Sequence, residues 1–170
     1  QANEMLKSSY NLGFLGLTQS VKEKELELRL VEKIKQFVLE LGKGFTFIGN
    51  QYRLEFNKKE YFIDMLLYQR NMCCLAALEL KIGSFKPEYI GKMNFYLSLL
   101  DKLEKQEHEN PSIGIILCAD KDHLDVEIAL QDVHNPIGVA EYQLLLSKKE
   151  LETIIINELK NESEESNKLD

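Results

Sequence analysis

YFIDMLLY (Tyr61–Tyr68) and MCCLAALELKI (Met72–Ile82) are neighbouring apolar segments, and together they decide the fold. The short polar stretch between them is typical of the turn of an antiparallel β-hairpin. The first segment contains one acid, Asp64, and the second ends with Glu79 and Lys81. Charges inside apolar strands are unfavourable unless they are paired or bind a metal. We therefore expect these three side chains to converge on one site.

Alternation along the second segment separates its charged residues from the core. Successive side chains of a strand point to opposite faces, so Glu79 and Lys81 would share one face. The hairpin would place Asp64 alongside them. The opposite face would carry apolar residues of the core: Leu78, Leu80 and Ile82.

Two neighbouring carboxylates form a hard-oxygen site that suits Mg²⁺ or Mn²⁺. Asp64 and Glu79 are the predicted metal ligands, and the backbone carbonyl of Leu80 could add a third. Lys81 could hold a water that attacks phosphorus and balance charge on a phosphate. The alternative is a plain salt bridge between Lys81 and one of the acids, because a Glu-x-Lys triplet is common.

The element order predicts a single α/β domain with a mixed β-sheet flanked by helices. We expect a lead-in segment over residues 1–19, a domain over 20–160 and a disordered acidic tail over 161–170. The predicted order is αβββαβαβα. Its segments are a helix capped at Ser20 and ending before Gly42, strands Phe45–Phe56, Tyr61–Tyr68 and Met72–Ile82, a helix from Pro87, a strand Ile113–Cys118, a helix Asp122–Gln131, a strand Ile137–Leu146 and a last helix capped at Ser147.

The composition describes a water-soluble domain. The chain has 170 residues, of which 44% are hydrophobic and 29% charged, and no apolar stretch long enough to span a bilayer. Three cysteines in apolar surroundings favour a reducing compartment, and hence a cytoplasmic location. The net charge of −7 is unusual for a nucleic-acid binder, although residues 41–100 carry eight basic and five acidic side chains.

The pattern resembles a known family. Asp64 with Glu79-Leu80-Lys81 in this element order is similar to the PD-(D/E)XK nuclease superfamily, which has a restriction-endonuclease-like core. More closely, LAALELKIGSFKPEYIGKMNFYLSLLD and the segments around it, from about Leu39 to Leu145, resemble the C-terminal domain of bacterial YhcG-type proteins, which are predicted nucleases. Members usually carry an additional N-terminal helical domain, and we expect that domain to be missing from this chain.

The resemblance implies roles for particular residues. Asp64 and Glu79 match the metal-binding acids, and Lys81 matches the catalytic lysine. The superfamily often has another acid on its first helix, for which Glu40 is the expected candidate, although an exposed glutamate at a helix end is the plainer explanation. Many members have Gln-x-x-x-Tyr on the helix after the lysine strand; the matching positions here are Lys92 and Tyr96, so the tyrosine fits and the glutamine does not.

Other polar residues are candidates for contacts with the substrate. Gln51 could reach a metal-bound water or a phosphate, and Arg53, Lys86 and Lys92 could contact backbone phosphates. The expected function is Mg²⁺- or Mn²⁺-dependent hydrolysis of phosphodiester bonds, in DNA, by a domain that could act as a homodimer. The alternative is a nucleic-acid-binding or assembly module that uses the same fold without catalysis.

Overall fold

The computed structural model describes residues 6–17, 22–144 and 148–166. These residues form a mixed six-stranded sheet in the order β1-β6-β5-β4-β3-β2. Strands β1, β6, β5 and β4 run parallel, whereas β3 and β2 are antiparallel to their neighbours. The elements are β1 (Ser9–Asn11), η1 (Gly13–Leu15), α2 (Glu23–Glu32), α3 (Ile34–Leu41), β2 (Phe45–Phe56), β3 (Lys59–Gln69), β4 (Cys74–Leu80), α4 (Glu88–Leu103), β5 (Ile113–Cys118), α5 (His123–Leu130), β6 (Ile137–Gln143) and α6 (Lys148–Ser166).

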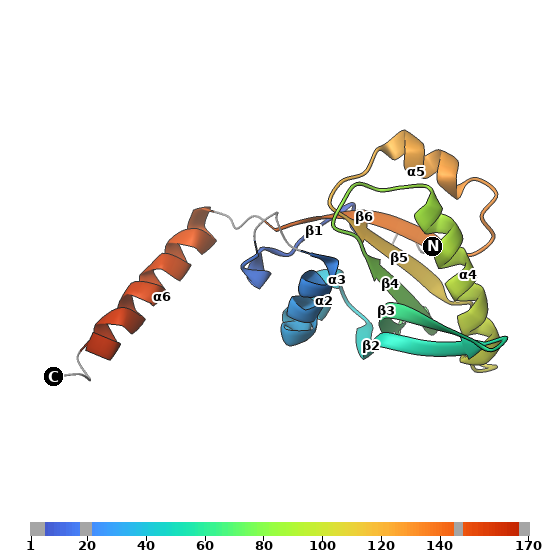
Figure 1. Cartoon of the computed structure of the whole chain (residues 1–170), viewed down its shortest axis with the longest axis horizontal. Coiled ribbons are helices and arrows are strands. Elements are labelled where there is room, and N and C mark those ends of the chain that lie inside the picture. Colours follow the sequence, from blue (N-terminus) through green and yellow to red (C-terminus); the bar gives the residue numbers. More distant parts are fainter. Residues whose placement is uncertain (1–5, 18–21, 145–147, 167–170) are drawn as a thin grey trace.

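Helices cover both faces of the sheet, which gives three layers (Figure 1). On one face, α2 and α3 contribute Leu26, Leu30 and Phe37 to a core with the buried faces of β3, β4 and β5. On the other face, α4 contributes Met93 and Leu97 to a second core. Because both faces are covered, β4 and β5 are buried along their whole lengths, as expected for central strands.

The predicted α/β class and the two hairpins are confirmed, and the three-strand antiparallel unit forms as expected. The first helix differs from the prediction because it breaks at Lys33, the C-cap of α2 and the N-cap of α3. The lead-in also contains a strand, β1, whose partner β6 lies far away in the sequence. Local sequence patterns do not reveal such a short parallel pairing.

The end of the chain was predicted wrongly in part. Residues 161–166, expected to be disordered, continue α6 to Ser166, and the hydroxyl of Ser163 donates to the Lys160 carbonyl at 2.8 Å. Three of these six residues, Glu162, Glu164 and Glu165, are glutamates, which have high helix propensity and so favour the extension. In Figure 1, α6 points away from the sheet. The predicted caps at Ser20 and Ser147 lie outside the described residues.

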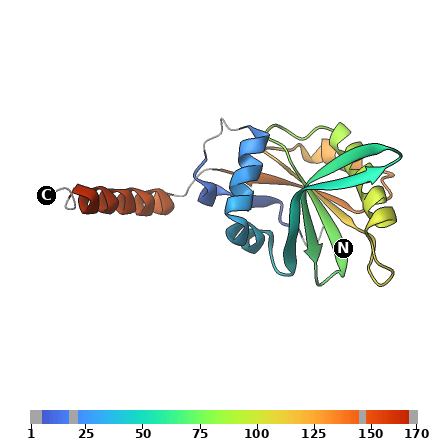
Figure 2. The ribbon, with the colours of Figure 1, turned by 60° about the horizontal axis from the view of Figure 1, so that its bottom comes forward.

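The β2–β3 hairpin bends away from β4 partway along its length (Figure 2). The β3–β4 ladder runs from Gln69↔Cys74 to Met65↔Leu78 and ends there, although β3 extends back to Lys59. The next opposed positions would be Asp64 and Glu79. The two predicted metal ligands therefore lie where β3 and β4 separate, and this place is called the fork below.

No helix in the described ranges is both long and apolar enough to cross a membrane.

Candidate active site

The backbone ladder between β3 and β4 ends at the fork, and hydrogen bonds from main-chain N–H groups to the carboxylates of Asp64 and Glu79 take its place. The Asp64 carboxylate accepts a hydrogen bond from the Leu80 N–H, with 2.9 Å between Oδ2 and N. In the opposite direction, Glu79 Oε1 accepts a weaker bond from the Asp64 N–H at 3.4 Å. Each acid therefore satisfies a main-chain donor of the facing strand, and this holds the two carboxylates close together at the strand ends.

Glu79 is an unusually buried acid. Only 3% of its surface is exposed, and its Oε2 atom has no hydrogen-bond partner among the described residues. Burial, followed by the negative charge of Asp64, raises the pKa of Glu79 from 4.5 to about 8, and Lys92 partly opposes this shift. A buried oxygen without a partner is unfavourable, so the geometry leaves Glu79 ready to accept a cation.

Gln51 connects the fork to α2. Its side-chain amide donates to Glu27 Oε2 at 2.7 Å and lies 3.3 Å from Asp64 Oδ1. The backbone of Gln51 has a φ of 45°, which is unusual for a residue other than glycine in the middle of a strand. Strained backbone conformations are concentrated at functional sites, and here the conformation accompanies a side chain that bridges two acids.

Lys81 follows the last residue of β4 and is held from three sides. Its ammonium nitrogen lies 3.5 Å from Glu23 Oε1 on α2 and 4.8 Å from the centre of the Tyr89 ring on α4. The Tyr142 hydroxyl donates to the Lys81 carbonyl at 2.8 Å. The side chain is largely buried, at 16% exposed. The lysine is thus fixed beside the fork, with its charge paired to Glu23.

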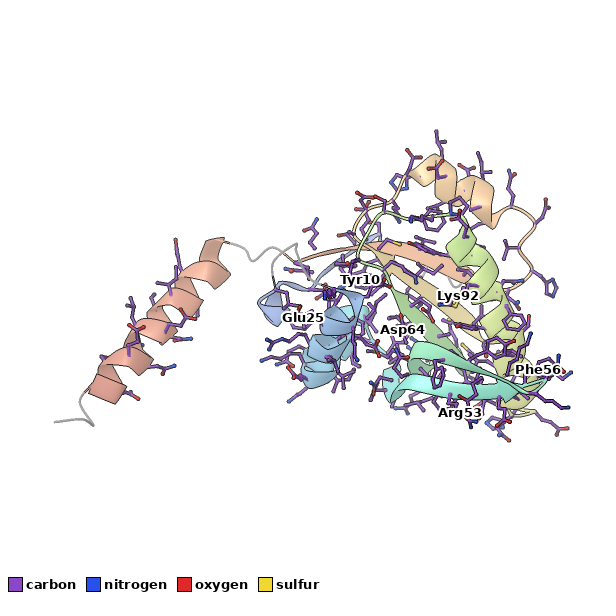
Figure 3. The ribbon with its side chains drawn as sticks, in the orientation of Figure 1. Tyr10, Glu25, Arg53, Phe56, Asp64 and Lys92 are labelled. Atoms are coloured by element: carbon purple, nitrogen blue, oxygen red, sulfur yellow. The ribbon has the colours of Figure 1, made fainter. Side chains whose placement is uncertain are left out.

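Lys92 and Tyr96 reach the fork from α4. The ammonium of Lys92 lies 3.8 Å from Glu79 Oε2 and 5.3 Å from the centre of the Tyr96 ring. Tyr96 is buried, and burial followed by the charge of Glu79 raises its pKa to about 12. Figure 3 labels Asp64 on β3 and Lys92 on α4.

Several residues singled out from the sequence lie elsewhere. Glu40 contacts Lys7 and the backbone N–H of Asn11 at the β1 edge of the sheet, because the break at Lys33 separates α3 from α2. Arg53 is bound to two acids of the hairpin, Glu55 and Glu60. Lys86 is exposed in the segment before α4. Ile82, predicted in the core with Leu78 and Leu80, is 45% exposed because β4 has already ended.

The helix acid at the fork is Glu27, which the sequence analysis missed. It is 8% exposed, and burial raises its pKa, opposed by the hydrogen bond from Gln51. A signal was present in the sequence. Glu27 lies next to Leu26 and one turn before Leu30, so it borders the buried stripe of α2.

The fork has the donors that a divalent cation requires. Asp64 and Glu79 supply two carboxylates, and the buried Glu79 Oε2 has no hydrogen-bond partner among the described residues. Within the described ranges no three His, Cys, Asp or Glu side chains are grouped closely enough to hold a metal by themselves. Mg²⁺ commonly takes only one or two carboxylates and completes its shell with water and substrate oxygens. The residues present fit that pattern.

A mixed sheet of this order, with Asp64 and Glu79-x-Lys81 at adjoining strand ends, defines a restriction-endonuclease-like domain of the PD-(D/E)XK type. The sequence comparison agrees with this class. The model of the family described as "YhcG PDDEXK nuclease domain" matches residues 3–160, and the chain belongs to this family.

A curated relative supports the same assignment. The chain is 33% identical over 143 residues to the Escherichia coli (strain K12) protein named "Putative nuclease YhcG", and the match covers 84% of the chain. It covers 38% of that relative, so the chain corresponds to less than half of the relative's length.

Solved structures give more distant similarities. A repair endonuclease from Pyrococcus abyssi matches with a TM-score of 0.47 at 17% identity, over 75% of this chain and 49% of that one. A structure of the EndoMS-dsDNA2 complex matches with a TM-score of 0.49 at 17% identity, over 74% of this chain and 46% of that one. Similarity at this level is too distant to assign residues of the site.

Proposed function

We propose that the fork binds Mg²⁺ or Mn²⁺ and that the domain uses it to hydrolyse phosphodiester bonds in DNA. The observation that supports this most strongly is the opposition of Asp64 and Glu79 just beyond the last ladder pair, with a buried Glu79 oxygen that has no hydrogen-bond partner among the described residues. Such an arrangement is unfavourable for the protein alone and becomes favourable when a cation enters.

The residues of the fork would have different roles in binding the ion and in holding its ligands. Asp64 and Glu79 would hold the ion, with the Leu80 carbonyl as a further candidate ligand. When bound, the ion would lower the pKa of a coordinated water and polarise the phosphate. Glu27 and Gln51 would keep Asp64 in place, because the Gln51 amide contacts both acids.

Lys81 would orient the attacking water and stabilise the negative charge that develops on the phosphate. In the hydrolysis, the water oxygen forms a bond to phosphorus and the bond from phosphorus to the leaving sugar oxygen breaks. One proton leaves the water, and the leaving oxygen ends protonated. Glu23 and Tyr89 would limit the positions that the Lys81 ammonium can take, since both contact it in the resting domain.

A cleavage assay tests this function. Wild-type protein with Mg²⁺ or Mn²⁺ is expected to cut single- or double-stranded DNA, whereas Asp64→Asn and Lys81→Met lose that activity. Lys105→Met is a suitable control, because Lys105 is a surface lysine outside the fork that contacts the Gln106 carbonyl. DNA binding without cleavage under all metal conditions would instead support the non-catalytic binding module.

A further inference from the structure

The positive charge of Lys92, next to Glu79, would have different interactions if a metal entered the fork. Lys92 forms the one ion pair of Glu79 in the described part of the chain, with 3.8 Å between Nζ and Oε2. At this distance the pair has charge attraction and no hydrogen bond, which agrees with Oε2 being left without a hydrogen-bond partner. Lys92 is 48% exposed whereas the Glu79 side chain is 4% exposed, so the lysine has solvent to extend into and the acid is enclosed by protein.

The charges at the fork determine how Lys92 would respond to a bound metal. Without metal, Asp64 and the ionised form of Glu79, which exists at alkaline pH, attract the ammonium of Lys92. A divalent cation between them would cancel both negative charges and repel the ammonium, so Lys92 would lose its partner. Any ligand that removes a favourable contact of the free state is in competition with that contact.

Lys92 would still be held near the fork after losing Glu79. Its ammonium lies 5.3 Å from the centre of the Tyr96 ring, and Tyr96 is buried in the α4 core. Cation–π contacts favour an ammonium at this distance. A free ammonium beside a metal site is well suited to a phosphate oxygen, because phosphate contacts require only a nearby positive charge.

We propose that Lys92 is the internal counter-ion of Glu79 in the metal-free domain, and that a divalent ion entering the fork releases it to bind a phosphate of the nucleic acid. The inference rests on the proposed function and adds a regulatory step, in which metal loading increases affinity for the substrate. By linkage, the substrate increases affinity for the metal by the same factor.

The first test is calorimetric titration of Mn²⁺ into metal-free protein at pH 8. Lys92→Met is expected to bind Mn²⁺ about tenfold more tightly than wild type, because the competing cation has gone, and Lys92→Gln should do the same. Lys102→Met is the matched control: Lys102 is also on α4 and lies 5.0 Å from the Phe56 ring centre. A lysine that merely supported the structure of the site would give the opposite result, weaker binding.

The second test measures the coupling. A fluorescein-labelled single-stranded oligonucleotide is titrated by anisotropy in EDTA and in Ca²⁺, which is used in place of Mg²⁺ to limit cleavage. Wild type should gain more affinity on adding Ca²⁺ than Lys92→Met does. Equal gains, or Mn²⁺ affinities that are equal or lower in Lys92→Met, would overturn the role of Lys92 while leaving the metal site intact. Absence of Mn²⁺ binding in wild type and variant alike would overturn the proposed function as well.

Discussion

Replacing Glu79 by glutamine should stabilise the metal-free domain at alkaline pH and at the same time remove its response to metal. The change keeps the shape of the side chain and removes its charge. Glu79 is buried, lies opposite the Asp64 carboxylate and has a pKa raised from 4.5 to about 8. The folded protein therefore holds a proton on Glu79 that the unfolded chain releases as the pH rises above about 4.5.

The sign and size of the effect follow from this difference in proton binding. Between pH 4.5 and 8 the folded state binds more protons than the unfolded state, so stability decreases as the pH rises through this window. One pKa unit corresponds to about 1.4 kcal/mol, which gives a ceiling of about 4 kcal/mol for Glu79 at pH 8. Local relaxation and entry of water lower this figure, and we expect about 2 kcal/mol.

Urea unfolding in EDTA at pH 5 and pH 8 measures the effect. Glu79→Gln and wild type should have similar free energies of unfolding at pH 5, and the variant should be more stable at pH 8. Adding Mn²⁺ should stabilise wild type and leave Glu79→Gln unchanged. Glu107→Gln, at an exposed acid, serves as the control. If Glu79→Gln destabilised the domain equally at both pH values, the reasoning from burial and charge would be refuted.

Three further substitutions test contacts that stabilise the fold, each measured by urea unfolding. Tyr142→Phe removes the hydrogen bond to the Lys81 carbonyl and should reduce the free energy of unfolding by about 1 kcal/mol; an unchanged midpoint would show that the bond contributes nothing. Gly114→Ala would place a Cβ 2.6 Å from Met93 Cγ, so we expect a loss of about 1–3 kcal/mol, and a loss near zero would mean that Met93 repacks freely. Asp122→Ala removes the cap that accepts two N–H groups of α5 and should reduce stability by about 1 kcal/mol, whereas Asp122→Asn should retain most of it.

The hairpin was predictable from the sequence because its signals are local. A short polar turn set the pairing of β3 and β4. Strand alternation predicted that Glu79 and Lys81 share a face, and β4 ends at Leu80, just before Lys81. The position of Asp64 opposite Glu79 follows from the same register. Leu78 and Leu80 are buried as alternation requires, and the pattern fails only at Ile82, beyond the end of the strand.

The remaining parts of the site depend on interactions distant in the sequence. The helix break at Lys33 has no glycine or proline to mark it, so one continuous helix was expected; Glu40 was taken as the candidate acid, and Glu27 was missed. The left-handed backbone of Gln51 is not a conformation that glutamine favours, and it is compatible with the bridge between Glu27 and Asp64. Strand β1 exists only through its pairing with β6.

The central claim is that the fork between β3 and β4 holds a catalytic divalent cation. Crystals of the domain soaked in Mn²⁺ and measured near the manganese absorption edge test it directly. The account predicts an anomalous peak in contact with the carboxylates of both Asp64 and Glu79, and loss of that peak in Asp64→Asn. A fork without a peak in well-ordered wild-type crystals, or a peak that persists unchanged in Asp64→Asn, would contradict it.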